Sequence, residues 1–172
     1  MGAFFTNVQV YAAGRGADET RLWVIDALRG RLAEQGFAEL SQADIEAGTE
    51  PDRGIVVGPA TDARWISVYD ELCENQDEAA IRGLAEHLSR GGGTAIGVLD
   101  HDSDVLRLWL CQDGQLVDTF DSNPNYFVGV SPDLPGQLTE EELELVRGHA
   151  DRWQEVLTHG ATADQLEGVW RE

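Results

Sequence analysis

The order of extended and helical segments is the feature that most restricts how this chain can fold. Alternating apolar residues predict a strand at 8–11, and apolar residues at helical spacing predict a helix whose N-cap is Asp18. The same order returns as a strand at 65–69, a helix capped by Asp77 and a strand at 94–99. The sequence therefore predicts an α+β fold with ferredoxin-like, duplicated βαβ units on a mainly antiparallel sheet.

An added β-hairpin is predicted at 105–121. Asp113-Gly114 lies between two segments of alternating polarity, which is the strongest short-range hairpin signal. Pairing about this turn places Trp109 opposite Asp118. The face then predicted to enter the core carries Leu106, Leu108, Leu110 and Val117.

The C-terminal part of the chain is predicted to be helical. Thr139 and Glu142 have the spacing of a capping box, and apolar residues continue at helical spacing from there to Gly160. A second, short helix precedes the C-terminus, and we expect both helices to cover a face of the sheet or an oligomer contact. The predicted organisation is one domain over 1–172, with its core at 5–122 and a C-terminal helical extension at 138–172.

The charge of the chain excludes several classes of function. The net charge is −20, and all 12 basic residues are arginine. Nucleic acids and anionic membranes bind through basic contacts, so neither is an expected partner, whereas a basic protein is. A chain without lysine cannot form a lysine Schiff base or a lysine-bearing phosphate loop. Genome composition is the alternative explanation of the charge.

The cellular compartment of the protein is predicted from signals that the sequence does not contain. It shows no signal peptide and no apolar run of membrane-spanning length. Cys73 and Cys111 have neither the spacing of a metal site nor that of a disulfide framework. We expect a soluble cytoplasmic protein with free thiols.

One edge of the predicted sheet should collect acidic side chains. In a ferredoxin-like core, the strands ending at Asp70 and Asp100 finish at the same edge, and the hairpin leaves it after Asp104. Neighbouring strand ends lie ~5 Å apart and alternate ones ~10 Å apart, which is close enough for some groups to share an ion. The candidate ligand-binding residues at this edge are Asp70, Glu71, His101, Asp121, Asn123 and Asn125.

The turn after the predicted strand at 94–99 is a candidate metal site. Asp100, Asp102 and Asp104 place carboxylates at alternate positions, as oxygen-ligand loops for Ca²⁺ or Mg²⁺ do. The Gly and distal Glu of an EF-hand are absent, and a solvated acidic turn is the competing interpretation. His101 is either a general base or metal ligand, or an exposed turn residue.

Three functions are compatible with these features. The first is a non-catalytic binding or regulatory module that acts as a homodimer. The second is a small metal-assisted hydrolase that uses the acidic edge. The third is an acidic immunity or inhibitor protein for a basic partner. No catalytic residue is predicted, because neither cysteine lies in a catalytic motif and no Gly-x-Ser-x-Gly elbow is present.

Overall fold

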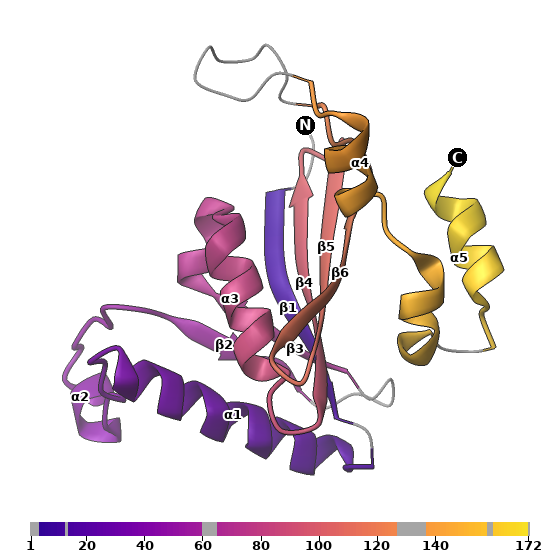
Figure 1. The fold of residues 1–172 in the computed structure, drawn as a ribbon. Helices are drawn as coiled ribbons and strands as arrows, with labels where there is room; N and C mark the ends of the chain where they lie inside the picture. The colour runs from indigo at the N-terminus through magenta and orange to yellow at the C-terminus, as the bar shows by residue number, and fades with distance from the viewer. Residues whose placement is uncertain (1–3, 13, 60–64, 127–136, 158–159, 172) are drawn as a thin grey trace.

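The computed structural model describes residues 4–12, 14–59, 65–126, 137–157 and 160–171. They form an α+β fold with an open six-stranded antiparallel sheet (Figure 1). The strands are β1 (Phe4–Ala12), β2 (Ile55–Val57), β3 (Ile66–Asp70), β4 (Gly93–His101), β5 (Val105–Gln112) and β6 (Gln115–Asp121). The helices are α1 (Ala17–Glu34), α2 (Gln42–Glu46), α3 (Glu78–Leu88), α4 (Glu140–Val146) and α5 (Ala163–Trp170), with 3₁₀ helices η1 (Glu71–Asn75) and η2 (Ala150–Val156).

The strands lie in the order β2-β3-β1-β4-β5-β6, and each neighbouring pair is antiparallel. β1 lies between β3 and β4, where Val8 pairs with Val68 on one side and Gly97 on the other. β3 and β4, which α3 connects, therefore run in the same direction and finish at the same end of the sheet. The predicted hairpin is confirmed as β5 and β6, which extend the sheet beyond β4.

The main core lies between one face of the sheet and the helices α1 and α3 (Figure 1). Its buried strand residues are Val8, Val10, Ile66, Val68, Ala95, Leu99, Trp109 and Cys111. The predicted cap of α3 is confirmed, because the Asp77 side chain accepts hydrogen bonds from the backbone N–H groups of Ala79 and Ala80. The helix approaches the sheet closely at Gly97, where an added Cβ would lie 3.0 Å from Ile81.

The start of α1 differs from the prediction. Its N-cap residue is Gly16, and Asp18 lies in the first turn. An acidic side chain is favourable in either position, since the first turn presents free N–H groups and the positive end of the helix dipole. The Asp18 carboxylate therefore suits the start of the helix without capping it.

The opposite face of β4, β5 and β6 is covered by η2 and α5, which lie on the other side of the sheet from α1 and α3 (Figure 1). Leu110, Phe120 and Trp153 are buried at the centre of this second core. The Trp170 ring stacks on Phe120, with 4.4 Å between ring centroids. We call the segment 147–171, which includes η2 and α5, the C-terminal layer.

The predicted register of the hairpin is wrong next to this second core. An irregularity between Leu110 and Cys111 pairs Trp109 with Thr119 and places Leu110 opposite Asp118. One extra residue in a strand changes the face to which the following side chains point. The extra residue is Val117 of β6, so Asp118 and Phe120 lie on the same face as Leu110. Both faces of β5 are buried, since Trp109 lies in the main core and the predicted leucine face forms the second core.

The predicted continuous helix from Thr139 to Gly160 is also wrong. The capping box of Thr139 and Glu142 is confirmed, but α4 ends at Val146 and η2 begins only at Ala150. Gly148 lies between them with φ +74°, a value that L residues rarely adopt. A Cβ at Gly148 would lie 2.7 Å from the Trp170 ring, so the chain turns where α5 packs against it.

A buried carboxylate joins the C-terminal layer to the sheet. Asp118 of β6 is 5% exposed and accepts hydrogen bonds from Trp153 Nε1 at 2.6 Å and from the His149 backbone N–H at 2.7 Å. It also accepts from His149 Nδ1 at 3.0 Å and from Arg152 at 3.2 Å. These donors compensate the cost of burying a charge.

The face of the sheet that bears the C-terminal layer is only partly covered. On the β1, β2 and β3 side, Val56 is 63% exposed, Tyr69 44% and Phe5 42%. Val56 and Tyr69 are register partners in β2 and β3. Among the described residues, no helix combines the length and apolar character needed to cross a membrane.

Candidate functional site

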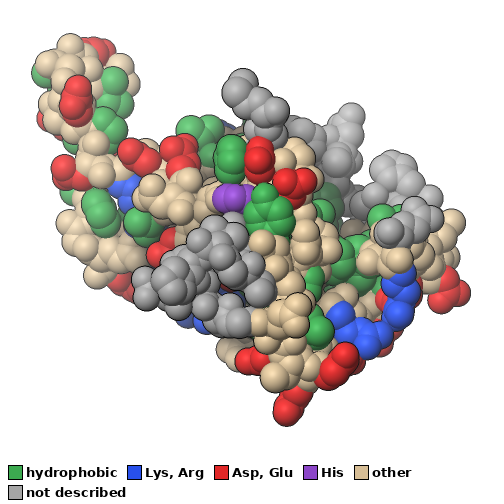
Figure 2. All heavy atoms as spheres, turned by 90° about the horizontal axis from the view of Figure 1, so that it is seen from above, with side chains coloured by type: hydrophobic (Ala, Val, Ile, Leu, Met, Phe, Trp, Pro, Cys, Tyr) green, Lys and Arg blue, Asp and Glu red, His purple; other side chains and the backbone are tan. Residues whose placement is uncertain are grey.

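The end of the sheet where β3, β4 and β6 finish and β5 begins carries the predicted acidic cluster. We call this region the acidic end. Its acidic residues are Asp70, Glu71, Glu74, Asp77, Glu78, Asp100, Asp102, Asp104 and Asp121. Figure 2, a view from above, shows acidic and hydrophobic side chains next to one another around a histidine. The topology thus brings the predicted residues to one end, as the sequence indicated.

Two carboxylates of the acidic end are buried in ion pairs. Asp70 accepts from Arg53 Nε at 2.9 Å and from Arg53 Nη2 at 2.5 Å. This hydrogen bonding raises the pKa of Arg53. Asp121 accepts from Arg107 Nε at 2.5 Å, and the same guanidinium binds Glu78. In both pairs the arginine neutralises a buried carboxylate. These two arginines therefore do not neutralise the exposed carboxylates of the acidic end.

His101 lies at the centre of the acidic end between aromatic rings. Its Nδ1 is 2.6 Å from Gln76 Oε1, while Gln76 Nε2 donates to the Asp100 carbonyl at 3.1 Å. An amide oxygen can only accept, so Nδ1 of His101 carries a proton. The imidazole lies edge-on to Phe4 at 4.9 Å and to Tyr126 at 5.8 Å between ring centroids. His101 is therefore a half-buried part of the surface, not an isolated turn residue.

The turn between β4 and β5 is built by its own carboxylates. Asp102 and Ser103 have positive φ values of 57° and 62°. Asp100 accepts from the Ser103 backbone N–H at 3.0 Å, and Asp104 accepts from the Tyr126 hydroxyl at 3.1 Å. That hydrogen bond raises the pKa of Tyr126. Two of the three predicted metal ligands thus hold the local backbone and a neighbouring ring.

The metal assignment of Asp100, Asp102 and Asp104 stays a hypothesis. Within the part of the chain that the structure describes, no group of three or more His, Cys, Asp or Glu side chains is arranged to hold a metal ion. A titration with Ca²⁺ and with Mg²⁺ at constant ionic strength would test it, since an ion specific for the folded state raises the melting temperature.

The predicted asparagines have different surroundings. The Asn123 backbone N–H donates to Asp121 at 2.9 Å, and Asn123 is an exposed residue. Asn125 accepts from the Leu138 backbone N–H at 3.0 Å and so joins the end of β6 to the approach to α4. Asn125 is therefore a connecting residue beside the acidic end.

Both cysteines are buried free thiols. Burial is the main cause that raises the pKa of Cys73 to about 11 and that of Cys111 to about 12. A nucleophilic cysteine needs a lowered pKa, so these environments do not activate either thiol.

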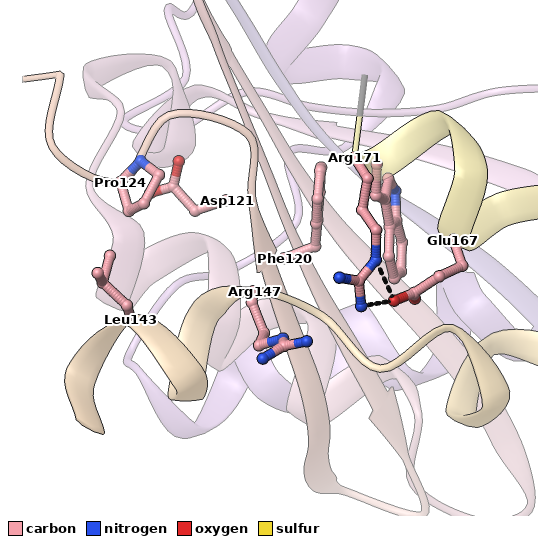
Figure 3. Close-up of a pocket in the computed structure, with 8 residues that line it drawn as sticks. Phe120, Asp121, Pro124, Leu143, Arg147, Glu167 and Arg171 are labelled. Atoms are coloured by element: carbon pink, nitrogen blue, oxygen red, sulfur yellow. Dashed lines mark hydrogen bonds and ion pairs between the residues drawn. The ribbon is translucent and has the colours of Figure 1, made fainter. Parts of the chain in front are cut away.

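Two of the hollows on the surface of the described residues lie near the acidic end. A cavity of about 230 Å³ opens between the end of β6, α4 and α5 (Figure 3). Phe120 and Trp170 line it, together with Arg147 and Arg171. Both guanidinium groups are already bound by carboxylates of their own helices, Arg147 by Glu144 and Arg171 by Glu167.

The second hollow, of about 420 Å³, lies at the β2 and β3 side of the acidic end. Apart from Glu71, none of its lining residues was predicted to take part in a site. The unpredicted lining residues are Gln35, Phe37, Asp52, Arg53, Leu72 and Asn75. They come from the C-terminal end of α1, the segment before β2 and η1, so no local sequence pattern connects them.

Comparisons with known proteins give no family for this chain. No protein-family model, no curated protein sequence and no solved structure matches it.

Proposed function

We propose that this protein is a non-catalytic binding module that holds a basic protein partner at its acidic end. The observation that supports the proposal is the distribution of charge there. Arg53 and Arg107 form ion pairs with the buried carboxylates of Asp70 and Asp121. Glu74, Asp77 and Asp104 are exposed. The outer surface is therefore more uniformly negative than the composition of this end suggests.

Exposed aromatic and aliphatic residues lie among these charges. Phe4 is 60% exposed and lies against His101, and Leu72 of η1 is 47% exposed. Protein interfaces combine an apolar centre with a polar rim, and aromatic residues dominate their binding energy. An acidic rim around apolar side chains fits a partner whose contact surface is basic at its edge and apolar at its centre.

A peptide of twelve residues that alternates lysine and leucine would test the proposal by fluorescence anisotropy. We expect it to bind, and we expect the peptide with all lysines acetylated not to bind. Binding should weaken with salt, because charges at the rim are screened. The decisive comparison uses two double variants of equal charge: Glu74→Gln/Asp102→Asn at the acidic end, and Asp18→Asn/Glu19→Gln in the first turn of α1.

The acidic-end variant should weaken binding by at least fivefold, and the α1 variant by less than twofold. Equal weakening by both would mean that the peptide responds only to total charge, and it would refute the proposed site. Asparagine is suited to position 102, because it tolerates the left-handed conformation found there.

A homodimer is the second arrangement that we propose to test. It is favoured by the uncovered apolar side chains of Val56, Tyr69 and Phe5 on the sheet. Repulsion between two chains of −20 each opposes it. Sedimentation equilibrium at low and high salt decides: a dimer that Tyr69→Ser abolishes supports this arrangement, and a monomer at both salt concentrations contradicts it.

The finer fold and compartment assignments also remain proposals. We propose that β1 to β4 with α1 and α3 form a ferredoxin-like duplicated core, supported by the order β2-β3-β1-β4. Superposition of β1-α1-β2 on β3-α3-β4 tests it, and a mismatch of the helix positions would contradict a duplication. We propose a cytoplasmic location because both thiols are free, which a localisation experiment with a tagged chain would check.

A further inference from the structure

The larger hollow at the acidic end combines apolar walls with unneutralised carboxylates. Its volume of about 420 Å³ lies in the range of about 300–1,000 Å³ that is typical of ligand pockets. Phe37 and Leu72 line it and are 37% and 47% exposed. Asp52 and Glu71 line it as well, and both are exposed residues.

Arg53, the one cation among the described residues of the lining, is already bound within the chain. Arg53 donates from Nε and Nη2 to the two oxygens of Asp70 and from Nη1 to Gln35. Its positive charge is therefore directed at Asp70, which lies behind the hollow and is fully buried as a side chain. Among the described lining residues, Asp52 and Glu71 supply two negative charges, and the positive charge of Arg53 is already paired with Asp70.

The two exposed carboxylates keep oxygen atoms for an external donor. Asp52 makes no hydrogen bond or ion pair with the other described residues. Glu71 uses Oε2 to accept from the Gly54 backbone N–H at 2.8 Å, and this bond fixes the position of its side chain. Its Oε1 has no partner in the described part of the chain. A positioned carboxylate loses less side-chain entropy on binding a cation than a freely rotating one does.

We propose that this hollow binds one cationic side chain, the ammonium of a lysine or the guanidinium of an arginine. The apolar stem of such a side chain would lie against Phe37 and Leu72, and its charge would lie between Asp52 and Glu71. Long basic side chains bury their stems on apolar surface in this way while the charged group reaches polar partners. The inference rests on the proposed function, because the basic partner supplies the side chain.

Binding to the hollow would be tested by NMR, from the amide chemical shifts of the protein in the presence of three small probes that each have a linear side chain. These are the N-acetyl N-methylamides of lysine, arginine and norleucine, of which the norleucine derivative has a stem without charge. The lysine and arginine probes should shift the amides of Gly54, Glu71 and Leu72, with a dissociation constant of about 1 mM for so small a ligand. Norleucine should bind at least fivefold more weakly.

Substitutions in the lining separate the contribution of charge to probe binding from the contribution of the apolar wall. Glu71→Gln keeps an acceptor for Gly54 and removes the charge, and Asp52→Asn removes the charge at the other side. Each should weaken both cationic probes by at least threefold, as should Phe37→Ala, whereas Glu19→Gln in the first turn of α1 should change binding by less than twofold. Equal binding of norleucine, or equal effects of Glu19→Gln and Glu71→Gln, would overturn the proposal.

Binding of the alternating lysine–leucine peptide shows whether the cation comes from a protein partner or from a small free amine. It also shows whether this inference or the proposed function has failed. If the peptide binds and the hollow variants weaken it, a partner side chain is the source, as proposed. If the peptide binds but these variants leave it unchanged, the hollow is not part of the interface and only this inference fails. If the lysine probe binds and the peptide does not, the hollow accepts small free amines and the proposed function fails.

Discussion

Replacement of Asp118 by alanine tests how the C-terminal layer is held on the sheet. The substitution removes the acceptor of four hydrogen bonds, two of them from the deeply placed Trp153 Nε1 and the His149 backbone N–H. A hydrogen bond to a charged group contributes about 1.5–3 kcal/mol, so these two alone correspond to about 3–6 kcal/mol. Water that enters the space left by the carboxylate would satisfy some of the donors, which brings the expected loss to about 3–5 kcal/mol.

Urea unfolding at neutral pH measures this loss in free energy of unfolding. Tryptophan emission should also move to longer wavelength, because Trp153 is only 3% exposed in the folded protein and loses its partner. Asp151→Ala is the matched control, since it removes the same charge from an exposed position in the first turn of η2. It should change stability by less than about 0.5 kcal/mol.

Asp118→Asn refines the argument, because its amide keeps the shape and one acceptor oxygen. We expect a loss of about 2–3 kcal/mol, since one donor then faces an N–H group. A loss below about 1 kcal/mol for Asp118→Ala, together with unchanged tryptophan emission, would refute the role assigned to Asp118.

Two further predictions concern buried thiols and a glycine. Because burial raises the pKa of Cys73 to about 11 and of Cys111 to about 12, iodoacetamide at pH 8 should modify the folded protein at least tenfold more slowly than the urea-unfolded chain. The stability linked to these raised pKa values is complete below about pH 9 and is lost as the pH rises through about 11 for Cys73 and about 12 for Cys111, which pH-dependent urea unfolding would show. Gly148→Ala should cost about 2–4 kcal/mol, because it adds a clash with Trp170 to the strain of a positive φ. Gly160→Ala, with a similar φ and open space, should cost only about 1 kcal/mol, and equal losses would show that the contact is unimportant.

Local signals in the sequence predicted local structure correctly. Asp113 and Gly114 both adopt the positive φ values that a tight hairpin turn needs, 49° and 82°, and few other residue pairs do so easily. Asp77 and Thr139 likewise cap helices through bonds within three residues of themselves. Such elements need no information from distant parts of the chain.

The errors arose where distant segments decide the outcome. The irregularity leaves Val117 of β6 as the extra residue next to Asp118, whose carboxylate binds donors some 31 to 35 residues later in the chain. Gly148 interrupts the C-terminal helix where Trp170 packs. The periodicity of apolar residues within one segment does not indicate these contacts with distant residues.

The candidate site shows the same division. Strand directions were enough to bring Asp70, Asp100 and Asp121 to one end of the sheet. The burial of Asp70 and Asp121 was not predictable, because it depends on Arg53 and Arg107 from other strands or loops. The hollow next to them was missed since its walls come from three separate segments.

The position of the C-terminal layer in the chain has a consequence during synthesis. The last of the six strands ends at Asp121, whereas Trp153 and Trp170 leave the ribosome later. In that interval the face around Leu110 and Phe120 lies open to water and can associate with other nascent chains. A layer that contributes none of the six named strands thus covers the apolar face that the newly made sheet exposes.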